Sequence, residues 1–151
     1  MLTATQRAFA AAQRRAILAT LSRSGQPRLV PICFVLADPA DGMPGTLLYS
    51  PLDEKPKRAA EVRELARVRD ILERPDVTLL FERWSEDWSQ LAWLRVRGRA
   101  ALIEPNDDPE AHQRMVEALR VRYPQYRTQR IDSRPMIRVV LTEAVGWSAS
   151  D

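Results

Sequence analysis

The sequence predicts a mainly β protein of the α+β class, an antiparallel barrel with helices packed against its outside. Apolar segments of strand length outnumber helical segments along the chain. Strands and helices do not alternate strictly, as a doubly wound parallel sheet would require. The length of 151 residues suits one domain, which we expect to span residues 1–151.

Six segments are predicted to be strands, because each is short, apolar or β-branched and bounded by turn residues. The turn at 24–27 contains Gly25 and Pro27 and separates the first two strands. Pro31 has no amide donor, so we expect it at an edge of the sheet or at a bulge. The predicted strands are 16–22, 28–37, 46–50, 77–82, 91–103 and 136–147.

Three helices are predicted from capping residues and from apolar positions that recur at helical spacing. Thr3 or Thr5 is expected to cap the first helix, and Asn106 or Asp107 the third. Pro75 ends the second, because the residue before a proline disfavours the helical region. The predicted helices end near residue 12, span 62–72 and span 106–123.

Three arginines share one face of the long predicted strand 91–103. Arg95, Arg97 and Arg99 alternate with apolar residues. Three unpaired charges are too costly to bury together, so these side chains face solvent, an anion or carboxylates across an interface. Gly98, which lies among them, predicts a bulge or a close backbone approach.

The chain contains one cysteine, Cys33, and one histidine, His112. A single cysteine excludes an intrachain disulfide and a cysteine zinc cluster, and a single histidine excludes a site with two histidine ligands. It also nearly excludes a Ser-His-Asp or Cys-His mechanism. We expect Cys33 to be a small buried hydrophobe and His112 to lie on the surface. No catalytic side chain and no metal ligand is predicted.

Charge and hydropathy argue against two classes of partner. The net charge is only +3, and arginines are mixed with acidic residues along most of the chain, which is unlike a nucleic-acid-binding stripe. No apolar run reaches the ~20 residues of a membrane helix. The first 21 residues lack the ordered regions of a signal peptide, so a cytoplasmic protein is expected.

The two lysines are placed unusually. Of 23 basic residues only Lys55 and Lys57 are lysine, and both lie between Ser50 and Arg58. Lysine offers a compact point charge that suits a phosphate approached from a tight loop. The segment is therefore predicted to hold a phosphate; the alternative is a helix-entry loop in which the lysines occur by chance.

Two tryptophans have different expected roles. Trp88 lies in the polar loop 83–90 and is the better candidate for a pocket wall. Trp93 lies in a predicted strand, where an aromatic side chain more often packs in the core or at a dimer contact.

Several of these segments, in this order, resemble the pyridoxamine 5'-phosphate oxidase-like split-barrel family. The similar segments are RAILATL at 15–21, GQP at 25–27, Pro31, the loop around Lys55 and Lys57, PDVTLL at 75–80, VRGRA at 96–100 and the closing strand 138–147. The stretch EDWSQLAW at 86–93 resembles an acidic-aromatic signature of an actinobacterial subgroup of that family.

This resemblance implies a six-stranded antiparallel split β-barrel with flanking helices, and a homodimer with its cofactor at the interface. The subgroup is expected to use coenzyme F-420, a deazaflavin with a phosphate and an oligoglutamate tail, while close relatives bind FMN. On the family pattern Lys55 and Lys57 grip the phosphate, with Ser50 and Arg58 as helpers. Thr78, on the next strand, lines the ring.

The implied function is an oxidoreductase that transfers hydride between the cofactor ring and a small organic substrate. Alternatives on the same fold are an FMN-dependent oxidoreductase and a non-enzymatic cofactor- or haem-binding module. The terminal arginine-histidine pattern of the pyridoxamine-phosphate oxidases proper is not matched here, which argues against pyridoxamine oxidation.

Overall fold

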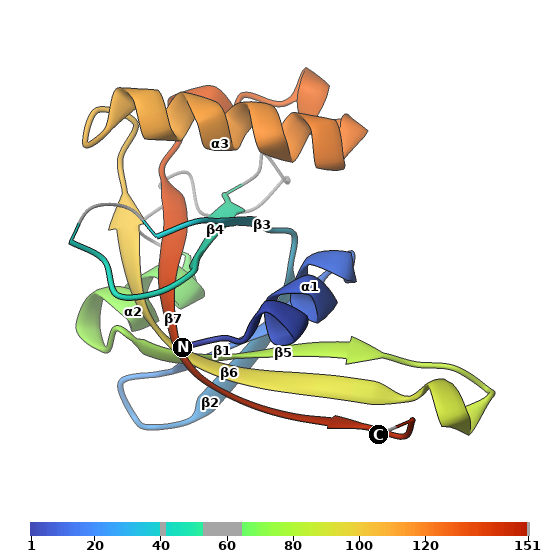
Figure 1. Ribbon diagram of the computed structural model, residues 1–151. Helices are drawn as coiled ribbons and strands as arrows, with labels where there is room; N and C mark the ends of the chain where they lie inside the picture. Colours follow the sequence, from blue (N-terminus) through green and yellow to red (C-terminus); the bar gives the residue numbers. More distant parts are fainter. Residues whose placement is uncertain (40–41, 53–64, 151) are drawn as a thin grey trace.

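A single antiparallel sheet dominates the structure, a computed structural model that describes residues 1–39, 42–52 and 65–150 (Figure 1). Within these ranges the sheet has seven strands in the order β2-β1-β5-β6-β7-β4-β3. All neighbouring strands are antiparallel. The strands are β1 Ala16–Leu21, β2 Pro27–Ile32, β3 Val35–Ala37, β4 Leu47–Pro51, β5 Asp76–Arg83, β6 Ala92–Ile103 and β7 Met136–Ser148.

The predicted strand 28–37 is in fact two strands, which is why the sheet has one more than the six predicted. The ladder breaks at Phe34, whose backbone amide donates instead to the Tyr123 hydroxyl at 3.2 Å. That hydroxyl donates in turn to the carbonyl oxygen of Arg14 at 2.8 Å. Because a side chain satisfies the amide, the chain can leave one edge of the sheet and begin another. Pro31 lies on the edge strand β2, as predicted.

The sheet curls along its two longest strands, β6 and β7. Their register shifts between Arg97 and Gly98, and Thr142 of β7 has no partner there, which marks a bulge. A Cβ on Gly98 would lie 2.4 Å from Cγ1 of Val139 and 2.8 Å from the carbonyl oxygen of Val140. The close approach predicted for Gly98 is confirmed. Beyond this point β5, β6 and β7 extend together away from the main body (Figure 1).

Three α-helices in the described part of the chain flank the sheet. The first, α1 (Ala4–Ala12), begins with a capping box in which Thr3 and Gln6 exchange backbone and side-chain hydrogen bonds. The second is α2 (Ala66–Glu73). The third, α3 (Pro109–Arg122), is capped by Asp108 rather than by Asn106 or Asp107. Pro109 suits the first helical position, which places the cap one residue later than predicted. Short 3-10 turns occur at η2 Trp88–Gln90, η3 Pro124–Thr128 and η4 Ile131–Ser133.

Two apolar clusters hold these layers together. The larger fills the inside of the curled sheet against α1 and α2, where Phe34 and Phe81 meet edge to face with ring centroids 5.3 Å apart. The smaller lies between α3 and strands β3 and β4. Among the helices in the described ranges, none is long and apolar enough to cross a membrane.

His112 is buried, so the predicted surface position was wrong. Its side chain lies on the inner stripe of α3 with Val116 and Leu119, at the helical spacing of four and three residues. Its Nε2 lies 2.9 Å from the carbonyl oxygen of Arg134. The hydrogen bond satisfies the ring, which makes burial of this polar side chain tolerable.

Candidate functional site

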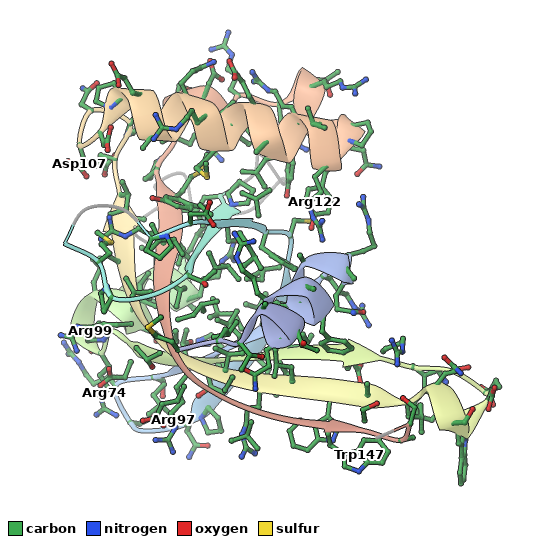
Figure 2. All side chains as sticks on the ribbon, viewed as in Figure 1. Arg74, Arg97, Arg99, Asp107, Arg122 and Trp147 are labelled. Atoms are coloured by element: carbon green, nitrogen blue, oxygen red, sulfur yellow. The ribbon has the colours of Figure 1, made fainter. Side chains whose placement is uncertain are left out.

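The outer face of β2, β1, β5, β6 and β7 carries apolar side chains that lack a covering layer in the described chain. In each strand alternate residues point inward to the core, and the others form this face. Figure 2 shows Trp147 and Arg97 on the side of the sheet opposite α1. Leu29, Val145 and Trp147 are 67%, 54% and 49% exposed. We call these strands' outward side the outer face.

Cross-strand register arranges the outer face in rows. Neighbours directly opposite each other in an antiparallel pair share a face, and their side chains touch. One row is Ile17, Leu80, Arg95 and Val145, and the next is Leu29, Ala19, Thr78, Arg97 and Glu143.

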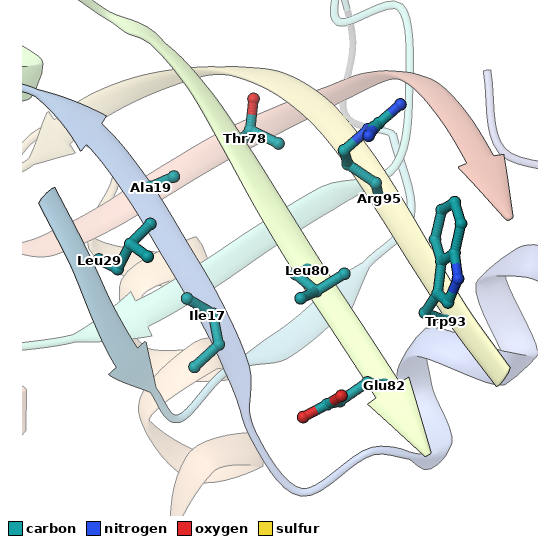
Figure 3. A pocket seen from close by; sticks show the side chains of 8 residues that line it. All are labelled: Ile17, Ala19, Leu29, Thr78, Leu80, Glu82, Trp93 and Arg95. Atoms are coloured by element: carbon teal, nitrogen blue, oxygen red, sulfur yellow. The ribbon is translucent and has the colours of Figure 1, made fainter. Parts of the chain in front are cut away.

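A hollow of about 420 Å³ lies on the outer face, where the first of these rows meets the second. Its size falls within the range of small-molecule sites. The lining is mostly apolar, and it has one carboxylate and one guanidinium (Figure 3). The lining residues are Ile17, Ala19, Leu29, Thr78, Leu80, Glu82, Trp93 and Arg95.

A second hollow of about 540 Å³ adjoins the first and shares Ala19 and Thr78 with it. Its lining is charged, with Arg97, Arg99, Asp76 and Glu143 among the contributors. Arg97 lies 3.7 Å from Glu143, and Arg99 lies 3.4 Å from Asp76; all four side chains are largely exposed. The outer face is therefore apolar at one end and charged at the other. A ligand with a planar apolar part and a polar arm fits this arrangement.

The structure places Thr78 between the two hollows, with its side chain on the outer face (Figure 3). Ser50 is buried on β4, opposite Ile137 of β7. Trp88 is 69% exposed in η2, at the tip of the β5–β6 hairpin, and does not line either hollow. Lys55, Lys57 and Arg58 lie outside the described residues. The roles of all six toward a cofactor stay predictions.

Sequence reasoning missed most of the apolar lining. Ile17, Leu29 and Leu80 were counted only as strand residues, and Trp93, expected to pack in the core or at a dimer contact, lies half-buried beside the hollow. A signal was present: the run AILATL at 16–21 is apolar at nearly every position instead of alternating. A strand apolar on both sides indicates that both faces are meant to be covered.

A buried carboxylate ties α2 to the sheet beside the second hollow. Oδ2 of Asp70 accepts hydrogen bonds from Oγ1 of Thr20 at 2.6 Å and from Nε of Arg28 at 2.8 Å. Burial alone favours the neutral carboxyl, but the Arg28 and Thr20 hydrogen bonds and the Arg28 charge outweigh it, so the pKa of Asp70 lies below its ordinary value. This contact anchors the middle of α2 to strands β1 and β2.

One side-chain nitrogen in the described part of the chain is buried and makes no hydrogen bond. Within the described ranges, Nε of Arg138 is buried without a hydrogen bond. Arg138 lies on β7 opposite Tyr49, the neighbour of Ser50 on β4. A buried guanidinium nitrogen in this state favours an anionic or carbonyl acceptor close to the end of β4.

Together, an antiparallel sheet curled around its own core and open between the edge strands β2 and β3, with a small-molecule-sized hollow on its outer face, is typical of the split β-barrel class. A family model described as pyridoxamine 5'-phosphate oxidase matches residues 2–148. The chain therefore belongs to the pyridoxamine 5'-phosphate oxidase family, and its fold is the flavin-binding split barrel of that family. The resemblance inferred from the sequence is confirmed.

Solved structures agree with this fold. A conserved hypothetical protein from Mycobacterium tuberculosis superposes with a TM-score of 0.72 at 22% identity, over 99% of this chain and 86% of that one. A protein described as an F-420 reductase gives 0.61 at 17% identity, over 95% and 98%. The haem storage protein HutZ from Vibrio cholerae gives 0.61 at 13%, over 94% and 90%. A comparison with curated proteins finds no match.

Proposed function

We propose that the protein is a homodimeric oxidoreductase that binds the deazaflavin coenzyme F-420 on the outer face and transfers hydride between its ring and a small organic substrate. The observation that carries this proposal is the pair of joined hollows. The apolar one offers Ile17, Leu80 and Trp93 to a planar ring. The charged one offers arginines to a polar arm. Thr78 lies at the junction, where its hydroxyl can hydrogen-bond the ring edge.

Donors for a phosphate are also available. Lys55 and Lys57 follow β4 in sequence, and the buried Nε of Arg138 lies on the strand paired with β4. A phosphate is suited to point charges of this kind and to planar guanidinium donors. The residues present therefore fit an anionic cofactor, with the lysine segment as the proposed phosphate grip.

The bound deazaflavin ring supplies the hydride chemistry. The chain's own part is to place the ring on a rigid sheet and to keep water from the side that the apolar residues cover. Arg95, whose guanidinium lies 5.9 Å from the centre of the Trp93 ring, adds a positive charge beside the hollow. A positive charge there favours an anionic ring or substrate.

Coenzyme F-420 is preferred to FMN for two reasons. The acidic-aromatic stretch at 86–93 resembles the subgroup expected to use it, and a structural neighbour is described as an F-420 reductase. A haem-binding role is less well supported, although HutZ shares the fold. The single histidine, His112, is buried on the inner side of α3 and hydrogen-bonded to the carbonyl oxygen of Arg134, away from the outer face.

Filling the apolar hollow tests the proposed place of the cofactor. We expect Ala19→Trp to weaken F-420 binding at least about tenfold, measured by quenching of deazaflavin fluorescence, because the indole would occupy ring space. Gln113→Trp, on the exposed side of α3, adds the same side chain far from the face and should bind as wild type. Unchanged affinity in a folded Ala19→Trp variant would show that the cofactor lies elsewhere.

A further inference from the structure

Two opposite charges on the outer face have no ion-pair partner among the residues that the structure describes. Arg97 is paired with Glu143, and Arg99 with Asp76. Glu82 and Arg95 form no ion pair with any residue that the structure describes, although they occupy neighbouring rows of the same two strands. Both line the apolar hollow (Figure 3).

In a single chain these charges cost little, because Glu82 and Arg95 are exposed to water. The apolar residues around them, however, form a continuous patch instead of lying singly on the surface. Such patches mark interaction sites. Any partner that covers the patch removes water from both charges. Each then needs an opposite charge from that partner, because an unpaired buried charge is strongly destabilising.

The partner with the right charges is a second copy of the chain. In a twofold dimer the same surface is used twice, so residue i contacts residue j and j contacts i. Glu82 lies opposite Trp93, and Arg95 lies opposite Leu80, which makes Glu82 and Arg95 diagonal neighbours on the face. A twofold axis in the plane of the face, passing between them, sets each Glu82 against the partner's Arg95.

The extent of the face suits this partner. Five strands and the eight residues of β5 give an area of roughly 24 by 26 Å, and protruding side chains add to it. A stable interface needs about 800 Å² from each partner, which is of the same order.

We propose that a second copy covers the outer face through two reciprocal ion pairs, each between Glu82 and the partner's Arg95, and that these pairs set the register of the dimer. The hollow then becomes a shared site, with one carboxylate and one guanidinium from each copy at its rim. This inference rests on the proposed function for its dimer and adds the residues that define it.

Charge reversal in two separate chains tests the pairing. Glu82→Arg gives a chain with arginine at both positions, and Arg95→Glu gives a chain with glutamate at both. Each variant alone should dimerise at least about a hundredfold more weakly than wild type in analytical ultracentrifugation, because both pairs become repulsive. An equimolar mixture should form a heterodimer, because both pairs are then restored between unlike chains.

Glu117→Arg is the matched control. Glu117 is exposed on α3, away from the outer face, so its reversal should change the dimer affinity less than about tenfold. Circular dichroism melts of all three variants check that each chain folds, since all three side chains are exposed.

Three results would overturn the inference: a monomeric wild type at 100 µM, single variants that dimerise as wild type, or a mixture without heterodimer. Titration of each sample with F-420 separates this inference from the proposed function. Cofactor binding by a monomer, or by a dimer insensitive to the reversals, keeps the function and overturns the pairing. A heterodimer that binds no flavin-type cofactor keeps the pairing and overturns the function.

Discussion

Replacing the buried carboxylate of Asp70 by an amide should destabilise the protein by about 2 kcal/mol. In Asp70→Asn the shape is kept, but the hydrogen bonds from Thr20 and Arg28 lose their charged acceptor. Each charge-assisted hydrogen bond stabilises the fold by about 1 kcal/mol more than a neutral one. The bond from the half-exposed Arg28 lies at the lower end of the range for such bonds. For a chain of this size the loss corresponds to a melting temperature about 4–8 °C lower.

The pH dependence of this effect has a definite sign. The pKa of Asp70 is lower in the folded protein than in the unfolded chain, where an aspartate has a pKa near 3.9. Its contribution is therefore complete above about pH 4 and is lost as the pH falls through the folded pKa. The difference in unfolding free energy between wild type and Asp70→Asn should stay constant from about pH 7 to pH 5 and shrink below about pH 4.

Urea unfolding of both proteins across this pH range is the assay. Asp76→Asn serves as control, because Asp76 is 86% exposed and its partner Arg99, 3.4 Å away, is 68% exposed. We expect the control to lose about 0.5 kcal/mol or less. Equal losses in the two variants, or a loss from Asp70→Asn that persists unchanged at pH 3, would refute the argument from the buried network.

Three further predictions concern the cofactor and the sheet. Alanine at both Lys55 and Lys57 should weaken F-420 binding at least about tenfold, since each lysine offers a charge-assisted contact of about 1.5–3 kcal/mol; unchanged affinity in the titration would remove the lysine segment as phosphate grip. Gly98→Ala should cost about 1–3 kcal/mol in urea unfolding because its Cβ meets β7, whereas Gly146→Ala, facing a flexible leucine terminus at 3.1 Å, should cost less; equal costs would contradict the close approach. Tyr123→Phe should lose about 1–3 kcal/mol, because the break between β2 and β3 leaves a backbone amide without its acceptor; wild-type stability would argue against that role.

Most of the sheet could be predicted from the sequence because its strands carry strong local signals. The bounds of β1, β5, β6 and β7 lie within one or two residues of the prediction. The split of β2 from β3 depends on Tyr123, some 90 residues away, so no local pattern reports it. The burial of His112 has a similar cause, since its partner is the distant carbonyl of Arg134.

The site was only partly predictable for a related reason. Thr78 was assigned from family resemblance and lies at the hollow, but its neighbours Ile17, Leu29 and Leu80 come from three strands that meet only in the folded sheet. Their proximity follows from register, which the sequence of one strand does not contain. The unpaired state of Glu82 and Arg95 likewise emerges only once the ion pairs of Arg97 and Arg99 are known.

Titration of the purified protein with coenzyme F-420 and with FMN, side by side, tests the central claim most directly. The proposal predicts saturable quenching of deazaflavin fluorescence, one cofactor for each chain of the dimer, and clearly weaker binding of FMN. Tighter binding of FMN would move the protein to the flavin-dependent branch of the family. Binding of neither cofactor would contradict the claim that the outer face is a flavin-type site.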